Sequence, residues 1–239
     1  MTKIVKLIMF LLASASFLGA HEDATKKFTT ALDLGVFSEY NYRQETLEDD
    51  FVFQGTASIQ TEQGISLGAW FNNSASPDFG SAAGNFSEVD LFASYGKTIG
   101  KGYGEFGITE FIFPDGSEGA RELHALYSFD NDIASPYLSV HWDIDRIGGL
   151  YVESGVEKSV EGFDVSALVS YADADYNEAY HGEAESNLHG YSVGVARTFP
   201  LDNQKEGLSV TVSTNYAGLL SFGKDSGNFF GGVVFNLEI

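Results

Sequence analysis

The stretch FDVSALVSY, residues 163–171, alternates larger apolar side chains with small or polar ones. Successive side chains of a β-strand point to opposite faces of the sheet, so a period of two predicts a strand with one apolar face. The positions of the apolar face are Phe163, Val165, Ala167, Val169 and Tyr171, and those between them are Asp164, Ser166, Leu168 and Ser170.

The same period recurs along the chain, with turn-forming residues between one repeat and the next. No segment has a convincing helical period, and no change of composition marks an internal domain boundary. The pattern predicts an all-β fold of one domain with about twelve antiparallel strands. The predicted segments are 32–42, 51–60, 65–72, 89–96, 104–109, 122–129, 137–144, 150–157, 163–171, 191–196, 208–216 and 233–239.

Both a β-sandwich and an outer-membrane β-barrel explain this alternation, because the apolar face lies in a core in one and against lipid in the other. The last strand favours the barrel. Val233, Phe235, Leu237 and Ile239 continue the apolar pattern to the end of the chain, as in the signal that the barrel-assembly machinery reads, although Phe is the usual last residue. We therefore expect a single antiparallel transmembrane β-barrel of the outer-membrane type, with a secreted β-sandwich binding module as an alternative.

The lengths of the connections agree with a barrel, in which short periplasmic turns alternate with longer external loops. We expect external loops at 44–50, 73–86, 113–119, 145–149, 172–187 and 220–228, and periplasmic turns at 62–64, 98–102, 129–136, 160–162 and 201–207. The segment 145–149 is short for an external loop.

Residues 1–20 have the layout of a secretory signal peptide, with Lys3 and Lys6 before an apolar centre at 7–13 and small residues up to Ala20. An earlier cleavage after Ala15 and a retained N-terminal anchor are alternatives. Residues 21–239 then form the barrel, and none of them belong to an apolar run long enough for a transmembrane helix. The expected location is the outer membrane of a Gram-negative bacterium.

The composition excludes several classes of function. The chain has no cysteine, which removes disulfides, thiol nucleophiles and cysteine zinc sites. A net charge of −21 disfavours nucleic acid and anionic bilayer surfaces and favours cations as partners. A strongly acidic, solvated surface without a specific partner explains the same charge.

The sequence resembles the TorF family of proteobacterial outer-membrane porins, beginning with the stretch from Leu34 to Ala75 and extending over most of the mature chain. In that family a Ser-x-Tyr-x-x-Arg-like segment precedes a Gln-Gly pair and a Gly-x-Trp-x-x-Asn-like strand. The corresponding residues here are Ser38, Tyr40, Tyr42-Arg43, Gln54-Gly55, Gly64, Gly68, Trp70 and Asn73, followed by the segment 87–95, Phe113-Pro114 with Glu122, and Tyr151-Val152-Glu153. Asp49-Asp50-Phe51 departs from the family, which often has a Pro-Ala-like pair there. The resemblance implies an outer-membrane channel of undefined substrate and supplies no site.

The polar face of the predicted strands is rich in carboxylates, which in a water-filled pore attract cations. We therefore expect a porin-like channel for passive diffusion of small hydrophilic solutes with a preference for cations, and as an alternative a closed structural or surface-interaction barrel. The expected pore-lining residues are Asp33, Glu39, Arg43, Asp90, Glu105, Glu122, His124, His141, Asp143, Glu153, Glu157 and Asp164.

Within this set, Arg43 is either a constriction residue or a structural ion-pair partner. His124 and His141 are either solvated or, with Glu122 and Asp143, ligands of a metal, and solvation is favoured. No nucleophile motif stands out, so the sequence predicts no enzyme activity, no cofactor and no metal site. The remaining expected partners are outer-membrane lipid and lipopolysaccharide, and the strand number favours a monomer.

Overall fold

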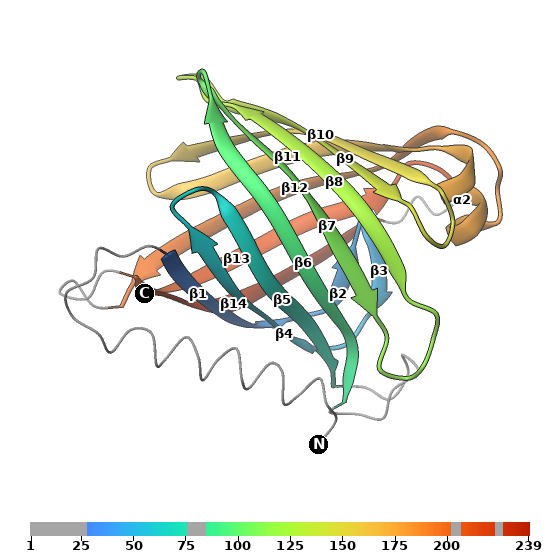
Figure 1. The fold of residues 1–239 in the computed structure, drawn as a ribbon, viewed down its shortest axis with the longest axis horizontal. Coiled ribbons are helices and arrows are strands. Elements are labelled where there is room, and N and C mark those ends of the chain that lie inside the picture. The colour runs from blue at the N-terminus through green and yellow to red at the C-terminus, as the bar shows by residue number, and fades with distance from the viewer. Residues whose placement is uncertain (1–27, 76–84, 202–206, 223–226) are drawn as a thin grey trace.

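A computed structural model describes residues 28–75, 85–201, 207–222 and 227–239; the predicted signal peptide, 1–20, lies outside them. Twelve antiparallel strands form one closed barrel in which neighbours in sequence pair in space, and β1 pairs with both β4 and β14 (Figure 1). The barrel strands are β1 (Phe28–Phe37), β4 (Val52–Thr61), β5 (Ile65–Ser74), β6 (Phe86–Ile99), β7 (Gly102–Ile112), β8 (Ala120–Phe129), β9 (Ser135–Asp143), β10 (Leu150–Val160), β11 (Phe163–Ala172), β12 (Asn187–Pro200), β13 (Leu208–Leu219) and β14 (Asn228–Glu238).

The predicted fold is confirmed, and the β-sandwich alternative is wrong because the sheet closes on itself. Closure pairs every strand on both sides, and this is the condition under which strands cross a bilayer without unpaired backbone groups. Among the described residues, no helix is long and apolar enough to span a membrane.

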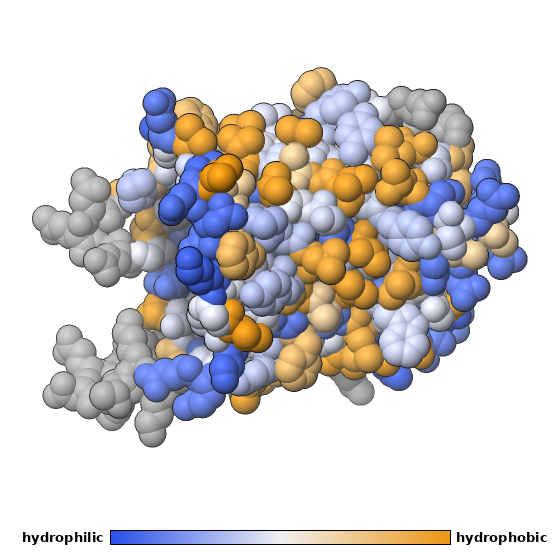
Figure 2. Space-filling model, turned by 90° about the horizontal axis from the view of Figure 1, so that it is seen from above, coloured by the Kyte–Doolittle hydropathy of each residue, from blue (hydrophilic) through white to orange (hydrophobic). Residues whose placement is uncertain are grey.

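The period of two gives the barrel an apolar outer face and a polar interior. On the outer face Leu67, Phe106 and Val233 are 57%, 63% and 51% exposed, as lipid-facing side chains are. Figure 2 shows apolar side chains gathered across the middle of the surface, with hydrophilic residues toward both ends.

The connections differ at the two ends of the barrel. One end has the connections 62–64, 100–101, 130–134, 161–162 and 201–207. The other has 38–51, 75–85, 113–119, 144–149, 173–186 and 220–227, most of which are longer. Because external loops are the longer ones in outer-membrane barrels, we call these the inner end and the outer end.

The predicted first strand is wrong beyond Phe37. The barrel strand ends there, and the chain folds into a separate hairpin of β2 (Tyr40–Tyr42) and β3 (Glu45–Glu48), which we call the inner hairpin. The expected loop 44–50 is therefore mostly strand. Tyr40 and Tyr42 kept the alternation going in sequence, but the inner hairpin pairs only with itself.

The loop between β11 and β12 contains a helix that the sequence pattern did not predict, α2 (Ala174–His181). Its N-cap is Asp173, whose side chain accepts a hydrogen bond from the Tyr176 backbone N–H at 2.9 Å. It ends at Gly182, whose φ of 74° is the left-handed conformation common after a helix. Eight residues are too few for a helical period to show, so only these caps indicated the helix.

Candidate functional site

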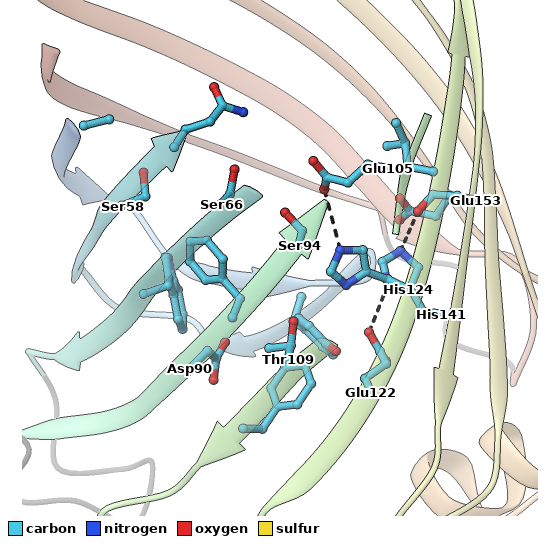
Figure 3. A pocket seen from close by; sticks show the side chains of 18 of the residues that line it. Ser58, Ser66, Asp90, Ser94, Glu105, Thr109, Glu122, His124, His141 and Glu153 are labelled. Atoms are coloured by element: carbon cyan, nitrogen blue, oxygen red, sulfur yellow. Dashed lines mark hydrogen bonds and ion pairs between the residues drawn. The ribbon is translucent and has the colours of Figure 1, made fainter. Parts of the chain in front are cut away.

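The polar faces of the strands enclose a cavity of about 670 Å³ inside the barrel. Figure 3 shows hydroxyl, imidazole and carboxylate side chains from several strands that line this cavity. The labelled ones are Ser58, Ser66, Asp90, Ser94, Glu105, Thr109, Glu122, His124, His141 and Glu153. A cavity of this size with carboxylates in its wall has the chemistry to hold water and small cations.

Most of the residues expected to line the pore lie on the barrel interior. The cavity is lined by Arg43, Asp90, Glu105, Glu122, His124, His141 and Glu153. Glu157 and Asp164 line a second cavity, of about 590 Å³, on β10 and β11. Asp33 on β1 accepts a hydrogen bond from Asn236 Nδ2 of β14 at 2.7 Å.

Glu39 and Asp143 lie outside the cavity of about 670 Å³. Glu39 lies between β1 and β2, is 5% exposed, and accepts hydrogen bonds from Thr46 Oγ1 at 2.9 Å and from Asn228 Nδ2. Asp143 is the last residue of β9 and lines a smaller cavity at the outer end; its Oδ1 accepts hydrogen bonds from the backbone N–H groups of residues 145, 146 and 147. Both carboxylates brace segments at the outer end, because β1 ends before Glu39 and β9 ends at Asp143.

The inner hairpin lies within the barrel rather than outside it, since Tyr42 and Arg43 at its tip line the interior cavity (Figure 1). Near its base Ser74 Oγ donates a hydrogen bond to Glu48, and Tyr40 Oη donates one to Glu88 Oε2 at 2.8 Å. The inner hairpin is therefore fixed to the wall at its base and narrows the lumen with its tip.

Arg43 forms an ion pair with Glu122 of β8, and the two side chains are 9% and 8% exposed. The other oxygen of Glu122 accepts from His141 Nδ1 at 2.9 Å, and His141 Nε2 lies 2.8 Å from Ser139 Oγ. The sequence left Arg43 either a constriction residue or a structural ion-pair partner, and its contacts support both roles. Arg43 has an ion-pair partner, and it lies in the narrowed part of the lumen.

Gln44 anchors the tip of the inner hairpin to the opposite wall. Its Oε1 accepts hydrogen bonds from Tyr151 Oη at 2.7 Å and from Ser170 Oγ at 2.6 Å, and its Nε2 lies 3.3 Å from Glu153 Oε1. The side-chain amide is thus held by β10 and β11 together.

The turn of the inner hairpin is strained. Arg43 and Gln44 have φ values of 50° and 68°, which a tight two-residue turn requires and which non-glycine residues adopt at a cost of about 1–2 kcal/mol each. Asn-Gly or Asp-Gly are the residues that such a turn favours. Arg43 and Gln44 are therefore explained by what their side chains contact inside the barrel.

A chain of hydrogen bonds links Ser139 to His141 and His141 to Glu122, as in the triad of a serine hydrolase. The surroundings, however, do not supply the other groups that such an active site needs. Ser139 lies in the middle of β9, which pairs with β8 on one side and β10 on the other, so its neighbouring backbone N–H groups are engaged in the sheet. An oxyanion hole needs such donors free, and Glu122 is shared with Arg43. We assign the chain of hydrogen bonds to the support of the Arg43 ion pair.

The other histidine of the interior, His124, has its Nε2 3.6 Å from Glu105 Oε1, and its ring centre lies 6.2 Å from that of His141. No group of three or more potential metal ligands occurs among the residues that the structure describes.

A smaller cavity, of about 210 Å³, lies beside the inner hairpin and is bounded by α2 and the outer rim. Its wall includes the aromatic side chains of Tyr42, Phe113, Tyr176 and Tyr180 together with charged ones, among them Arg43, Glu88, Glu122, Asp143 and Arg146. Burial raises the pKa of the Tyr176 phenol to about 12, so this ring is neutral and keeps an electron-rich face. The outer cavity thus combines aromatic rings with charged side chains.

Sequence reasoning did not place Gln44, Tyr42, Tyr151 or Tyr176 among the pore-lining residues, although Tyr42 and Tyr151 belong to the motifs of the TorF resemblance. Tyr151 also alternates with the apolar residues of its strand, and a buried tyrosine on the polar face needs a polar partner. Nothing local marked Gln44, since its partners lie on β10 and β11.

The model of a family described as a bacterial protein of unknown function (Gcw_chp) matches residues 21–216. No curated protein matches the sequence.

Solved structures similar to this chain include outer-membrane barrels. The KdgM porin in complex with disordered oligogalacturonate aligns with a TM-score of 0.53 and 9% identity, over 88% of this chain and 97% of that one. An outer-membrane channel from Pseudomonas putida F1 aligns with a TM-score of 0.50 and 9% identity, over 92% and 98%. Outer membrane phospholipase A from Escherichia coli aligns less well, with a TM-score of 0.45 and 13% identity over 87% of this chain and 92% of that one. The first two likenesses support the closed β-barrel fold.

Proposed function

The chain belongs to the Gcw_chp family of bacterial proteins, and we propose that it is an outer-membrane channel through which small hydrophilic solutes diffuse passively, with a preference for cations. The observation that carries the proposal is the acidic interior of the closed barrel. The cavity of about 670 Å³ is lined by the acidic residues Asp90, Glu105, Glu122 and Glu153. Arg43 is the only arginine or lysine among the described residues that line it.

Carboxylates inside a low-dielectric wall lower the electrostatic energy of a cation and raise that of an anion. Since Arg43 is already paired with Glu122, its charge does little to offset the other acids. We therefore expect potassium to pass more readily than chloride.

The TorF resemblance belongs to the same proposal. Several residues that carry it meet inside the barrel around the tip of the inner hairpin: Tyr42-Arg43, Glu122, Tyr151 and Glu153. Outer-membrane lipid and lipopolysaccharide are proposed to surround the apolar outer face, and the barrel-assembly machinery to recognise β14.

A closed barrel with a structural or surface-interaction role is a second candidate, favoured by one observation: the inner hairpin occupies part of the lumen and is held there by Arg43 and Gln44.

Single-channel conductance in planar bilayers under a potassium chloride gradient tests the two. Discrete steps with a reversal potential on the potassium side are the expected result for the refolded protein. If neither the wild type nor the Arg43→Ala variant conducts although both are folded and inserted, the channel function is contradicted. The closed barrel with a structural or surface-interaction role then remains.

A further inference from the structure

The guanidinium of Arg43 lies in a cage of aromatic rings. Its Cζ is 4.9 Å from the ring centre of Tyr42, 4.4 Å from that of Tyr151 and 5.5 Å from that of Tyr176. The rings come from β2, β10 and α2, three elements far apart in the sequence. A cation within about 6 Å of a ring centre is attracted by the negative face of the ring, and planar guanidinium also stacks on it.

One carboxylate completes the cage. Glu122 pairs with Arg43, and its second oxygen is fixed by His141 Nδ1 at 2.9 Å, which orients the carboxylate toward the guanidinium. Rings on several sides and an oriented carboxylate are the features that recognise guanidinium, whereas a compact, strongly hydrated ion such as potassium gains little from the rings.

The cage lies in the neck between the two cavities. Tyr42, Arg43 and Glu122 line both the cavity of about 670 Å³ on the inner side and the cavity of about 210 Å³ on the outer side. The Arg43 side chain thus lies where the two spaces meet. A solute that crossed the barrel through these cavities would pass the aromatic and carboxylate groups that now surround Arg43.

Arg43 is supplied by an element that is independent of the barrel wall. The two strands of the inner hairpin pair only with each other, so the hairpin can shift without breaking any ladder of the barrel. Its turn is strained at Arg43 and Gln44, with φ values of 50° and 68°, so part of the contact energy at the tip is offset by the backbone.

We propose that Tyr151, Tyr176 and Glu122 form a binding site for small solutes that carry a guanidinium group, with Arg43 as its built-in occupant. This rests on the proposed channel function and names the solute class that the channel recognises. A guanidinium solute takes the place of the Arg43 side chain when the tip of the inner hairpin withdraws; Tyr42, which adjoins Arg43, leaves with the tip. The remaining interior acids Glu105 and Glu153 raise the local concentration of such cations.

The test removes the Arg43 side chain from the cage and supplies a guanidinium ion in solution to replace it. In Arg43→Ala the cage keeps Tyr151, Tyr176 and Glu122 but loses the guanidinium. Methylguanidinium chloride added to bilayers that hold this variant is expected to reduce the potassium current, at a concentration about tenfold lower than methylammonium chloride requires. The double variant Arg43→Ala/Glu122→Gln is expected to lose this difference between the two ions.

Arg121→Ala is the matched control. Arg121 also pairs with a glutamate, Glu110, but its side chain is 50% exposed and no ring contact places it in a cage. Its removal is expected to leave the response to methylguanidinium as in the wild type, where Arg43 fills the cage.

The outcomes separate this inference from the channel function. If Arg43→Ala conducts and the two ions block it equally, the guanidinium site is overturned and the channel stands. If no variant conducts, calorimetric titration of methylguanidinium into the refolded protein is the deciding measurement. Binding to Arg43→Ala that is lost in the double variant would support the guanidinium site without the channel. Absence of binding to both variants would overturn the guanidinium site. Arg43→Gln serves in both measurements if Arg43→Ala does not refold.

Discussion

The Cζ of Arg43 lies 4.4 Å from the centre of the Tyr151 ring, and the hydroxyl of the same ring donates to Gln44 at 2.7 Å. One tyrosine on β10 therefore contacts both turn residues of the inner hairpin, one through its face and one through its edge. Because Tyr151 is only 1% exposed, its position is fixed by the barrel wall, and it holds the hairpin tip in the lumen.

The ion pair beneath this contact is expected to control conductance. Glu122→Gln leaves the buried Arg43 guanidinium without its carboxylate, a change that costs about 3–5 kcal/mol in buried pairs. The least costly response is release of the inner hairpin, so the open probability in bilayers is expected to rise.

Glu110→Gln removes the partner of Arg121 at an exposed site, where a pair contributes about 1 kcal/mol or less, and is expected to leave conductance unchanged. Equal conductance of Glu122→Gln and the wild type, with both folded, would mean that the hairpin does not gate the lumen.

A disulfide should lock the inner hairpin in place. A Cβ atom on Gly190 of β12 would lie 2.9 Å from Gln44 Cβ, which is shorter than the roughly 3.8 Å of a disulfide, so the hairpin tip must move away from β12 by about 1 Å for the bond to form. The chain has no cysteine of its own to interfere. We expect oxidised Gln44→Cys/Gly190→Cys to be non-conducting, and a reductant to restore wild-type current.

Gly190→Cys alone measures the strain of the added side chain, which would also lie 2.9 Å from the Gly218 carbonyl oxygen. Full current through the oxidised double variant would show that solutes bypass the hairpin tip.

Cation preference should fall when an interior carboxylate is neutralised. Glu105 lines the inner cavity, and its side chain is 27% exposed there. Glu105→Gln is expected to lower the potassium-to-chloride permeability ratio by about fivefold, which corresponds to roughly 1 kcal/mol of lost attraction. The reversal potential under a salt gradient measures the ratio, and an unchanged value would remove Glu105 from the permeation path.

The two faces of a strand should respond differently to the same charge. Leu67→Arg places a guanidinium on the outer face, where Leu67 is 57% exposed, and is expected to destabilise the barrel in lipid by about 2–4 kcal/mol. Ser66→Arg adds the same charge one residue away, on the cavity side of β5, and is expected to cost less. Urea unfolding from lipid vesicles gives both free energies of unfolding, and the reverse order would mean that the strand faces are assigned wrongly.

The helix α2 should depend on its N-cap. Asp173→Ala removes the hydrogen bond to the Tyr176 backbone N–H and is expected to destabilise the helix by about 1 kcal/mol. Hydrogen exchange at residues 174–181 should accelerate about fivefold, while exchange in β11 and β12 stays as in the wild type.

The sequence by itself determined the barrel, because the alternation of side chains along a strand is a local property that each segment carries on its own. Segments such as 163–171 gave the strand, its apolar face and its polar face, so Glu105, Glu122 and Glu153 were expected inside and lie on the cavity. The strand number followed from counting such segments, and the barrel was favoured over a sandwich by the last strand, whose apolar pattern runs to Ile239.

The tertiary structure decided the interior. Whether residues 38–51 formed an outer loop or an inner hairpin depended on partners that no local pattern names: Glu122 for Arg43, 79 residues away, Ser170 for Gln44, 126 residues away, and Asn228 for Glu39, 189 residues away. Such contacts exist only once closure brings β8, β11 and β14 around one lumen. The period of two fixes which way a side chain points, and the closed barrel fixes what it meets there.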